Sequence, residues 1–548
     1  MSDLTPASNH FKQQLLIKNL LFTPIAKNDE QEIVYKNNFR MSYKEFKKRV
    51  NKLANLLTKM GVKEGDTVAI MDYDSHRYLE CYFAVPMIGA VLHMINIRLS
   101  HEQILYTIDH AQDDVLFINS DFIPIIEQIK GRIDTINNYV LIADENEDIK
   151  SKTIPFLGEY EELLKEQSDE FTFLDFDENT RATTFYTTGT TGMPKGVYFS
   201  HRQLVMHTLG SLITLSTHQN QGNFHQNDVY MPITPMFHVH AWGIPYMATF
   251  LGVKQVYPGK YIPDVLLDLI DREKVTFSHC VPTILHMLLN SPKVENINLS
   301  GWKVIIGGAA LTKALTINAL KKGIDIFTGY GMSETCPILS LAQLSQKDLE
   351  KDIETQADIR IKTGRPLALV ELEIVDENMD KIPHDGESTG EIVVRSPWLT
   401  EGYLKDQKNS ENLWHGGYLH TGDIAHCDES GFFKITDREK DIIKVGGEWI
   451  SSLELEDIIN QHQSVEEVAV IALLDEKWGE RPLALVVLKD GDEKMVEKEI
   501  LAHTKEFIKK GIMARESMLL KIHFVDSIDK TSVGKINKKK LREKYKNL

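Results

Sequence analysis

The stretch YTTGTTGMPKGVYFSH at residues 186–201 constrains this chain more than any other part of its sequence. Three glycines and one proline fall within residues 189–196, so the stretch cannot continue as a helix or a strand. Its backbone N–H groups are then free to converge on a bound oxygen, and the threonine hydroxyls and Lys195 add further donors to an anion. The stretch predicts a phosphate-binding loop, with a polar surface turn as the alternative.

The best-known phosphate loop is excluded by spacing. A Walker loop requires G-x-x-x-x-G-K-[ST], and counting from Gly189 places Pro194 where the second glycine is needed. A P-loop kinase or GTPase is therefore not expected.

Composition limits the classes of protein that remain. A chain of 548 residues predicts at least two domains, and 42% apolar with 26% charged residues is an ordinary globular mixture. The net charge of −17 argues against nucleic acid or an anionic membrane as the main partner. The four cysteines form no C-x-x-C pair, and the longest apolar stretch, at residues 83–95, is too short to span a bilayer. We expect a soluble, cytoplasmic protein without a transmembrane segment or a secretory signal.

The hydrophobic pattern alternates between short and long segments. Apolar strand-like runs alternate with amphipathic helix-like stretches, which predicts an α/β fold. The expected strands are 67–73, 114–119, 139–143 and 302–308, and the expected helices are 43–61 and 263–274. From about residue 438 two strand runs, 467–474 and 483–489, precede one helix at 496–510 and a lysine-rich end, which predicts a smaller α+β domain.

A second glycine-rich segment, TGYGMSETC at residues 328–336, has the chemistry of a nucleotide site. Its glycines allow close approach to a planar base, Tyr330 can cover that base, and Glu334 offers the hard oxygen that Mg²⁺ prefers. The alternative is a turn with a capping serine and a solvated glutamate.

Taken in order along the chain, these segments resemble the motifs of the adenylate-forming superfamily, which contains acyl-CoA synthetases, luciferases and peptide-synthetase adenylation domains. Residues 186–201 resemble its phosphate loop, residues 328–336 its Y-G-x-T-E motif with Ser333 in place of threonine, and GGAAL at 307–311 its adenine-lining segment. The resemblance implies that Thr190 and Glu334 bind Mg²⁺ and act in catalysis. It implies nucleotide-binding roles for Thr187, Thr188, Gly189, Thr191, Gly192, Lys195, Gly308, Ala309, Thr328, Gly329, Tyr330, Gly331 and Ser333.

Three later segments resemble the rest of that superfamily's site. GGYLHTGD at 416–423 makes Asp423 the expected ligand of the ribose hydroxyls. TDREKDIIKVGGEWIS at 436–451 resembles the hinge, with Asp437 as pivot and Arg438 as a ribose ligand. DKTSVGKINKKKL at 529–541 matches the C-terminal T-x-x-G-K, whose lysine, here Lys535, reaches the active site, whereas a solvated basic tail is the alternative. The expected cofactor-binding set also includes Lys440 and Lys444, and the expected domains are 1–436 and 437–548.

The segment PMFHVHAWG at 235–243 contains two histidines one residue apart, a spacing that zinc ligands can have. We reject a metal site because no further ligands lie nearby in the sequence. The resemblance instead places His238 and Val239 beside the acyl carboxylate and Trp242 in the pocket wall. Trp449 resembles the mobile aromatic gate of long-chain acyl-CoA synthetases, with a packed hinge-side aromatic as the alternative.

The resemblance therefore predicts a large N-terminal α/β domain of several subdomains and a small mobile α+β domain. It implies an AMP-forming fatty acid–CoA ligase that uses ATP, Mg²⁺ and coenzyme A and acts on a medium- or long-chain acid. We expect small-molecule substrates as partners, together with a second copy of the chain in a homodimer. We do not expect nucleic acid as a partner. Another carboxylic acid, another acceptor such as a carrier-protein thiol or oxygen, and a non-catalytic nucleotide-binding regulator remain open alternatives.

Overall fold

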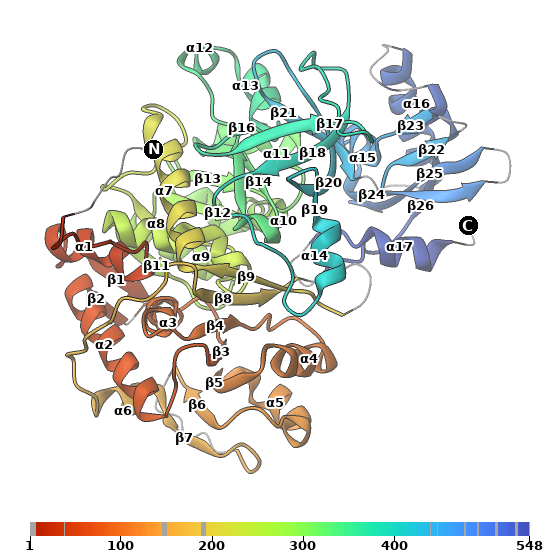
Figure 1. Cartoon of the computed structure of the whole chain (residues 1–548). Helices are drawn as coiled ribbons and strands as arrows, with labels where there is room; N and C mark the ends of the chain where they lie inside the picture. The colour runs from red at the N-terminus through yellow and green to blue at the C-terminus, as the bar shows by residue number, and fades with distance from the viewer. Residues whose placement is uncertain are drawn as a thin grey trace.

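The computed structural model describes residues 7–37, 39–144, 151–187, 193–438, 440–445, 448–475, 478–489, 493–509, 513, 515–531, 535–546 and 548. Two large sheets, a smaller third sheet and a separate C-terminal unit follow one another along these residues (Figure 1). None of the described helices is long and apolar enough to cross a membrane.

The first large sheet has seven strands within the described residues, in the order β7-β6-β5-β3-β4-β8-β9. All neighbours are parallel except β8 and β9, which form the antiparallel pair that flanks the phosphate loop. The strands are β3 (Thr67–Met71), β4 (Val91–Met94), β5 (Asp113–Asn119), β6 (Asn138–Ile142), β7 (Phe156–Glu159), β8 (Arg181–Tyr186) and β9 (Gly196–Ser200). Every residue of β3 is buried, as expected for a central parallel strand with helices on both faces.

The second large sheet has nine strands within the described residues, in the order β16-β15-β14-β13-β12-β10-β11-β1-β2. Its central strands, β11 to β14, are parallel, and the antiparallel β14–β15 pair ends close to the candidate site. The strands are β1 (Glu32–Tyr35), β2 (Phe39–Ser42), β10 (Val229–Pro232), β11 (Lys254–Tyr257), β12 (Phe277–Cys280), β13 (Lys303–Ile306), β14 (Asp325–Gly331), β15 (Ile338–Leu341) and β16 (Arg365–Pro366).

The helices begin where the sequence supplies caps. Ser42 accepts a hydrogen bond from the backbone N–H of Glu45 at the start of α2, and Ser200 and Gln203 form a capping box at the start of α7. The helices of the large domain are α1 (Phe22–Lys27), α2 (Tyr43–Lys59), α3 (His76–Met87), α4 (His101–Ala111), α5 (Ile123–Ile129), α6 (Tyr160–Lys165), α7 (His201–Thr217), α8 (Ile244–Leu251), α9 (Pro263–Glu273), α10 (Pro282–Leu289), α11 (Lys313–Lys321), α12 (Gln346–Leu349), α13 (Ile353–Arg360) and α14 (Gln407–Leu413).

A third sheet and the C-terminal unit complete the chain. The third sheet has the order β17-β18-β20-β19, with β21 paired to β20; its strands are β17 (Glu371–Val375), β18 (Gly390–Arg395), β19 (Trp414–His415), β20 (Tyr418–Cys427) and β21 (Phe433–Arg438). The C-terminal unit contains β22 (Ile443–Val445), β23 (Glu448–Ile450), β24 (Val465–Asp475), β25 (Gly479–Leu488) and β26 (Lys521–Phe524) with α15 (Ser452–Asn460), α16 (Glu493–Lys509) and α17 (Lys538–Tyr545). It lies beside the third sheet, at the blue end of the colour scale (Figure 1).

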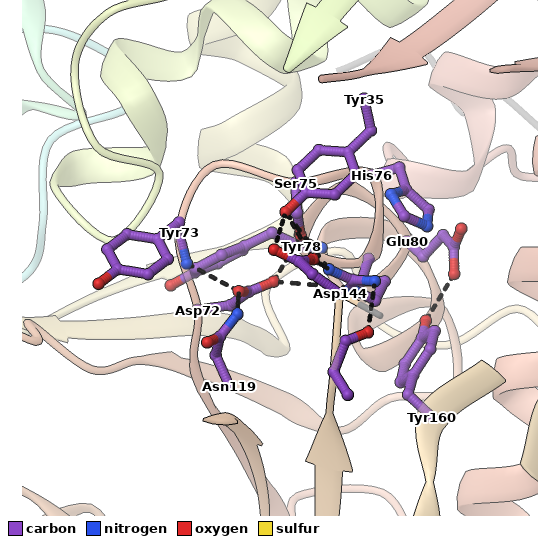
Figure 2. Close-up of polar contacts among 12 residues, drawn as sticks. Tyr35, Asp72, Tyr73, Ser75, His76, Tyr78, Glu80, Asn119, Asp144 and Tyr160 are labelled. Carbon is purple, nitrogen blue, oxygen red and sulfur yellow. Dashed lines mark hydrogen bonds and ion pairs between the residues drawn. The ribbon is translucent and has the colours of Figure 1, made fainter. Parts of the chain in front are cut away.

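A buried polar network ties the two large sheets together at the carboxyl ends of β3, β5 and β6 (Figure 2). The Asp72 carboxylate, just after β3, accepts a hydrogen bond from the side-chain amide of Asn119 at 2.7 Å. The Asp144 carboxylate, just after β6, accepts one from the Tyr35 hydroxyl of the nine-stranded sheet at 2.8 Å and is ion-paired to Arg77. Tyr35, Asp72, Arg77 and Asn119 are buried, whereas Asp144 lies at the exposed edge of the network. Because the buried groups have partners of opposite charge or matching hydrogen-bonding capacity, the network helps to hold the two sheets together.

The expected α/β class and the smaller α+β domain are confirmed. The strand runs expected at 67–73, 114–119, 139–143 and 302–308 form β3, β5, β6 and β13, and those expected at 467–474 and 483–489 form β24 and β25. The helices expected at 43–61, 263–274 and 496–510 form α2, α9 and α16.

Candidate active site

A narrow cavity opens where the ends of β13 and β14 meet the loop before α8. Residues from four distant parts of the chain line it: His238, Val239, Trp242, Ile305, Gly307, Gly308, Gly329, Tyr330, Gly331, Met332, Ser333, Pro337, Ile338 and Lys535. Among the residues that the structure describes, Lys535 is the one lining residue from the C-terminal unit. Several residues that the sequence analysis assigned to one site, on motifs hundreds of residues apart, are therefore neighbours around one cavity.

The glycines are required here by close packing. A Cβ atom at Gly331 would lie 1.8 Å from the Pro337 carbonyl oxygen, and one at Gly329 would lie 2.7 Å from Ile305. A Cβ at Gly307 would meet the Gly329 carbonyl at 2.8 Å. Any side chain at these positions would push strands apart or fill the cavity.

One wall of the cavity comes from a left-handed turn. The five consecutive residues of Val239–Gly243 all have φ between 47° and 73°, a conformation that costs energy for the four that are not glycine. The contacts of the buried His240 ring stabilise the turn. This ring shares a 2.8 Å hydrogen bond with the Thr183 hydroxyl and packs among aromatic rings. His240 is thus a core residue in this structure, whereas its neighbours face the cavity.

His238 and Trp242 both line the cavity from this turn. Burial, reinforced by the charges of Lys535 and Arg98, lowers the pKa of His238 to about 3. The imidazole is therefore neutral at physiological pH and can accept or donate a hydrogen bond without placing a charge next to a substrate carboxylate. The Trp242 ring is buried close to Gly307 and lines the cavity.

Three polar side chains, Tyr330, Asp423 and Arg438, form a connected chain of contacts beside the cavity. The Tyr330 hydroxyl donates a 2.8 Å hydrogen bond to the buried Asp423 carboxylate, which is ion-paired to Nε of Arg438 at 3.1 Å. The pairing of β20 with β21 sets Asp423 directly opposite Arg438. Both residues are thus held where two sugar hydroxyls could bridge a carboxylate and a guanidinium.

Lys535 enters the cavity from the C-terminal unit. Its Cε lies 3.4 Å from the position that a Cβ of Gly308 would occupy. Burial, together with the nearby Arg438 charge, lowers the pKa of Lys535 to about 8, although Asp423 and Glu334 act in the opposite direction. An anion in the cavity would favour the charged form of Lys535 and offset the cost of burying it. This is expected of a lysine that binds a phosphate or a carboxylate.

Asp437, the expected hinge residue, has contacts with both units. The buried Asp437 carboxylate accepts hydrogen bonds from the backbone N–H and the hydroxyl of Ser452, both at 2.6 Å, at the start of α15. Lys538 donates to the same hydroxyl at 2.6 Å and pairs with Glu456 at 2.8 Å. Asp437 lies in β21 of the third sheet, so this cluster joins that sheet to the C-terminal unit.

Of the two expected Mg²⁺ ligands, Glu334 and Thr190, only Glu334 lies within the described residues. Its carboxylate is buried beside the cavity and accepts a 2.7 Å hydrogen bond from the Tyr403 hydroxyl. A hard, buried carboxylate near an anion-binding cavity suits Mg²⁺. Thr190, its expected partner, lies outside the described residues, as do Thr188, Gly189, Thr191 and Gly192.

The other expected site residues that the structure describes are not among the residues that line the cavity. Thr187 donates its backbone N–H to the Lys195 carbonyl at 2.9 Å, closing the base of the phosphate loop. Thr328 is buried in β14, whereas Ala309, Lys440 and Lys444 are exposed. Trp449 pairs with Lys444 through the β22–β23 hairpin, but its side chain lies outside the described residues.

Sequence reasoning missed Tyr403. It lies in an unremarkable segment, TEGYLK, with no glycine-rich or charged pattern around it. Only its pairing with Val197, beside the phosphate loop, brings it to the site. That pairing leaves no signal in the order of residues.

Comparison with known protein families shows to which family the chain belongs. The family profile described as AMP-binding enzyme matches residues 23–404, more than half of the sequence. The chain belongs to the AMP-binding enzyme family. This AMP-binding enzyme also matches the AMP-binding enzyme C-terminal domain over residues 454–535, which ends at Lys535.

Individual relatives of this AMP-binding enzyme cover it almost completely. A long-chain-fatty-acid–CoA ligase from Thermus thermophilus is 38% identical over 93% of this chain and 91% of its own length. A 3-methylmercaptopropionyl-CoA ligase from Ruegeria lacuscaerulensis is also 38% identical, over 97% of this chain and 98% of its own. The crystal structure of the anthranilate CoA ligase AuaEII in complex with anthranoyl-AMP has a TM-score of 0.85 at 22% identity, with 98% of each chain covered, and supports the fold.

Proposed function

We propose that this AMP-binding enzyme activates a medium- or long-chain fatty acid with ATP and transfers the acyl group to coenzyme A. The observation that carries the proposal is the meeting of Lys535 with His238, Tyr330 and Gly308 around one cavity. A cation from the C-terminal unit, a neutral histidine and a glycine-lined nucleotide wall are what an acyl-adenylate needs on its three sides. The similarity to relatives named as CoA ligases supports the choice of acceptor.

In the first half-reaction a carboxylate oxygen attacks the α-phosphorus of ATP, and pyrophosphate leaves. The Lys535 ammonium offsets the charge that builds between the acid oxygen and the α-phosphate. The neutral His238 orients the carboxylate, while Asp423 and Arg438 hold the ribose. Mg²⁺, when bound at Glu334, supplies charge neutralisation to the phosphates.

In the second half-reaction the thiol sulfur of coenzyme A attacks the acyl carbon, and AMP leaves with the bonding electron pair. Lys535 has no role in this step. We propose that residues 437–548 then turn about Asp437, so that Lys535 withdraws and another face of the small domain meets the cavity. The Asp437–Ser452 hydrogen bonds would hold the helix α15 to the pivot during this movement.

The acid is proposed to be aliphatic because several lining residues of the cavity are apolar: Val239, Trp242, Ile305 and Ile338. Each methylene that becomes buried contributes about 0.8 kcal/mol, so kcat/KM should rise with chain length until Trp242 or the channel end stops the chain. The relative named for 3-methylmercaptopropionyl-CoA makes a shorter, sulfur-containing acid the second candidate.

The chain is also proposed to work in the cytoplasm, in agreement with its four cysteines. Cys81, Cys280, Cys336 and Cys427 are all buried and free, as a reducing compartment favours.

The test is ATP–pyrophosphate exchange across straight-chain acids of two to eighteen carbons and 3-(methylthio)propionate, followed by detection of the thioester after coenzyme A is added. We expect exchange to peak at medium or long chains and AMP to equal thioester. A preference for acetate, or for the thioether acid, would replace the proposed substrate. Absence of exchange with every acid would favour a nucleotide-binding regulator.

A further inference from the structure

Tyr403 contacts two charged residues, Glu334 and Lys195, at the same time. Its hydroxyl donates a 2.7 Å hydrogen bond to Oε1 of Glu334, and the face of its ring lies 4.5 Å from Nζ of Lys195. Glu334 is buried, so a carboxylate that lost this donor would lose a substantial part of its solvation. Lys195 gains a cation–π contact that directs its flexible side chain.

The backbone around Tyr403 is fixed to both elements that carry these charges. Tyr403 pairs with Val197 of β9, and the Leu404 N–H donates to the Gly196 carbonyl at 2.8 Å, immediately after the phosphate loop. The Thr400 N–H donates to the Glu334 carbonyl at 2.9 Å. The Ser410 hydroxyl accepts a 2.8 Å hydrogen bond from the Tyr403 N–H and holds the segment from the other side. The ring is therefore a rigid bridge rather than a loose surface side chain.

The Tyr403 hydroxyl is the donor in its contact with Glu334. Its hydrogen bond engages Oε1 of Glu334 and so restricts the orientation of the carboxylate.

We propose that Tyr403 is a positioning residue for Mg·ATP, which orients the Glu334 carboxylate toward the metal and the Lys195 ammonium toward the phosphates. This rests on the proposed function, because Mg·ATP is its substrate. Tyr403 acts through Glu334 and Lys195 and does not itself touch the reacting atoms. Its effect belongs to nucleotide binding and adenylation and not to thioester formation.

The two contacts can be removed separately. Tyr403→Phe removes the hydroxyl and keeps the ring, whereas Tyr403→Leu removes both. Tyr418→Phe is the matched control, because the Tyr418 hydroxyl also donates to a glutamate, Glu371, at 2.6 Å, and its ring also carries a cation, Arg395, at 3.7 Å. Glu371 and Arg395 belong to β17 and β18 of the third sheet and to neither of the two glycine-rich segments.

The main readout is calorimetric binding of α,β-methylene-ATP with Mg²⁺ and with EDTA. We expect Tyr403→Phe to reduce the gain in affinity that Mg²⁺ gives the wild type by roughly tenfold, the effect of losing a hydrogen bond to a charged group. Tyr403→Leu should also weaken binding in EDTA, because Lys195 loses its support. In exchange assays Tyr403→Phe should raise the Mg²⁺ concentration needed for half-maximal rate, while thioester formation from pre-made acyl-adenylate stays at the wild-type rate.

Three outcomes decide the matter. A wild-type Mg²⁺ response in Tyr403→Phe, or an equal change in Tyr418→Phe, would overturn the proposal. If either Tyr403 variant fails to fold, the other still decides, since each removes the hydroxyl. If the wild type binds the analogue but exchanges with no acid, the proposed function fails, and the calorimetric comparison still tests the role of Tyr403.

Discussion

At the scale of single residues, the site combines groups whose burial alters their ordinary chemistry. Lys535 is brought beside the Arg438 guanidinium, and burial with this like charge lowers its pKa to about 8. His238 is made neutral for the same physical reason, with its pKa lowered to about 3. The cavity therefore contains Lys535, which loses its proton more easily than an ordinary lysine, together with an uncharged His238.

This predicts a pH limit on adenylation. When Lys535 lies in the cavity its pKa is lower than in water, so it binds fewer protons there. Raising the pH from about 8 to about 10.5 therefore favours the arrangement with Lys535 in the cavity, but it also removes the positive charge of the ammonium. The kcat/KM for ATP in exchange should therefore fall above about pH 8. Lys535→Arg should retain charge across this range and lose the fall, and an unchanged profile in Lys535→Arg would assign the limit to another group.

A second residue-scale prediction concerns chain length. Trp242 is buried at the apolar end of the cavity against Gly307. Trp242→Leu should move the preferred acid to longer chains by opening that end, with each accepted methylene adding about 0.8 kcal/mol of binding. The measurement is kcat/KM across the acid series with ATP affinity as the control, and an unmoved optimum would remove Trp242 from the acyl wall.

At the scale of elements, the ends of β13 and β14 can approach only because glycine occupies both. Gly331→Ala must move the Pro337 backbone, since the new Cβ would lie 1.8 Å from its carbonyl oxygen. We expect the free energy of unfolding to fall by about 1–3 kcal/mol, as overpacking typically costs, together with weaker ATP binding. Gly131→Ala is the control, because a Cβ there meets no atom within 4 Å. Equal denaturation midpoints for the two variants would contradict this packing argument.

How far the sequence predicts these elements depends on how local each signal is. Buried parallel strands such as β3 and β5 are continuous apolar runs between polar turns, so they could be recognised. The left-handed turn at Val239–Gly243 could not, because four of its five residues are not glycine and only tertiary packing makes them adopt positive φ. Tyr403 was missed for a related reason, since its place beside Glu334 comes from pairing with Val197, some two hundred residues away.

At the scale of the whole molecule, the C-terminal unit touches the large domain through two different kinds of contact. The Asp437–Ser452–Lys538 cluster is buried and well paired, as a permanent pivot should be. Lys535 instead enters the cavity at an energetic cost that is recovered when an anion is present. The motifs predicted a lysine in the site and a pivot at Asp437, but the difference between their contacts becomes visible only in the folded structure.

The central claim is that Lys535 serves adenylation and then leaves, and Lys535→Ala measured in the two half-reactions tests it most directly. ATP–pyrophosphate exchange with the preferred acid should lose about 2.7–4 kcal/mol of transition-state stabilisation, as for removal of one key electrostatic donor. Thioester formation from pre-made acyl-adenylate and coenzyme A should proceed at close to the wild-type rate. Equal impairment of both half-reactions would contradict the account, because Lys535 would then be structural or the C-terminal unit would not move.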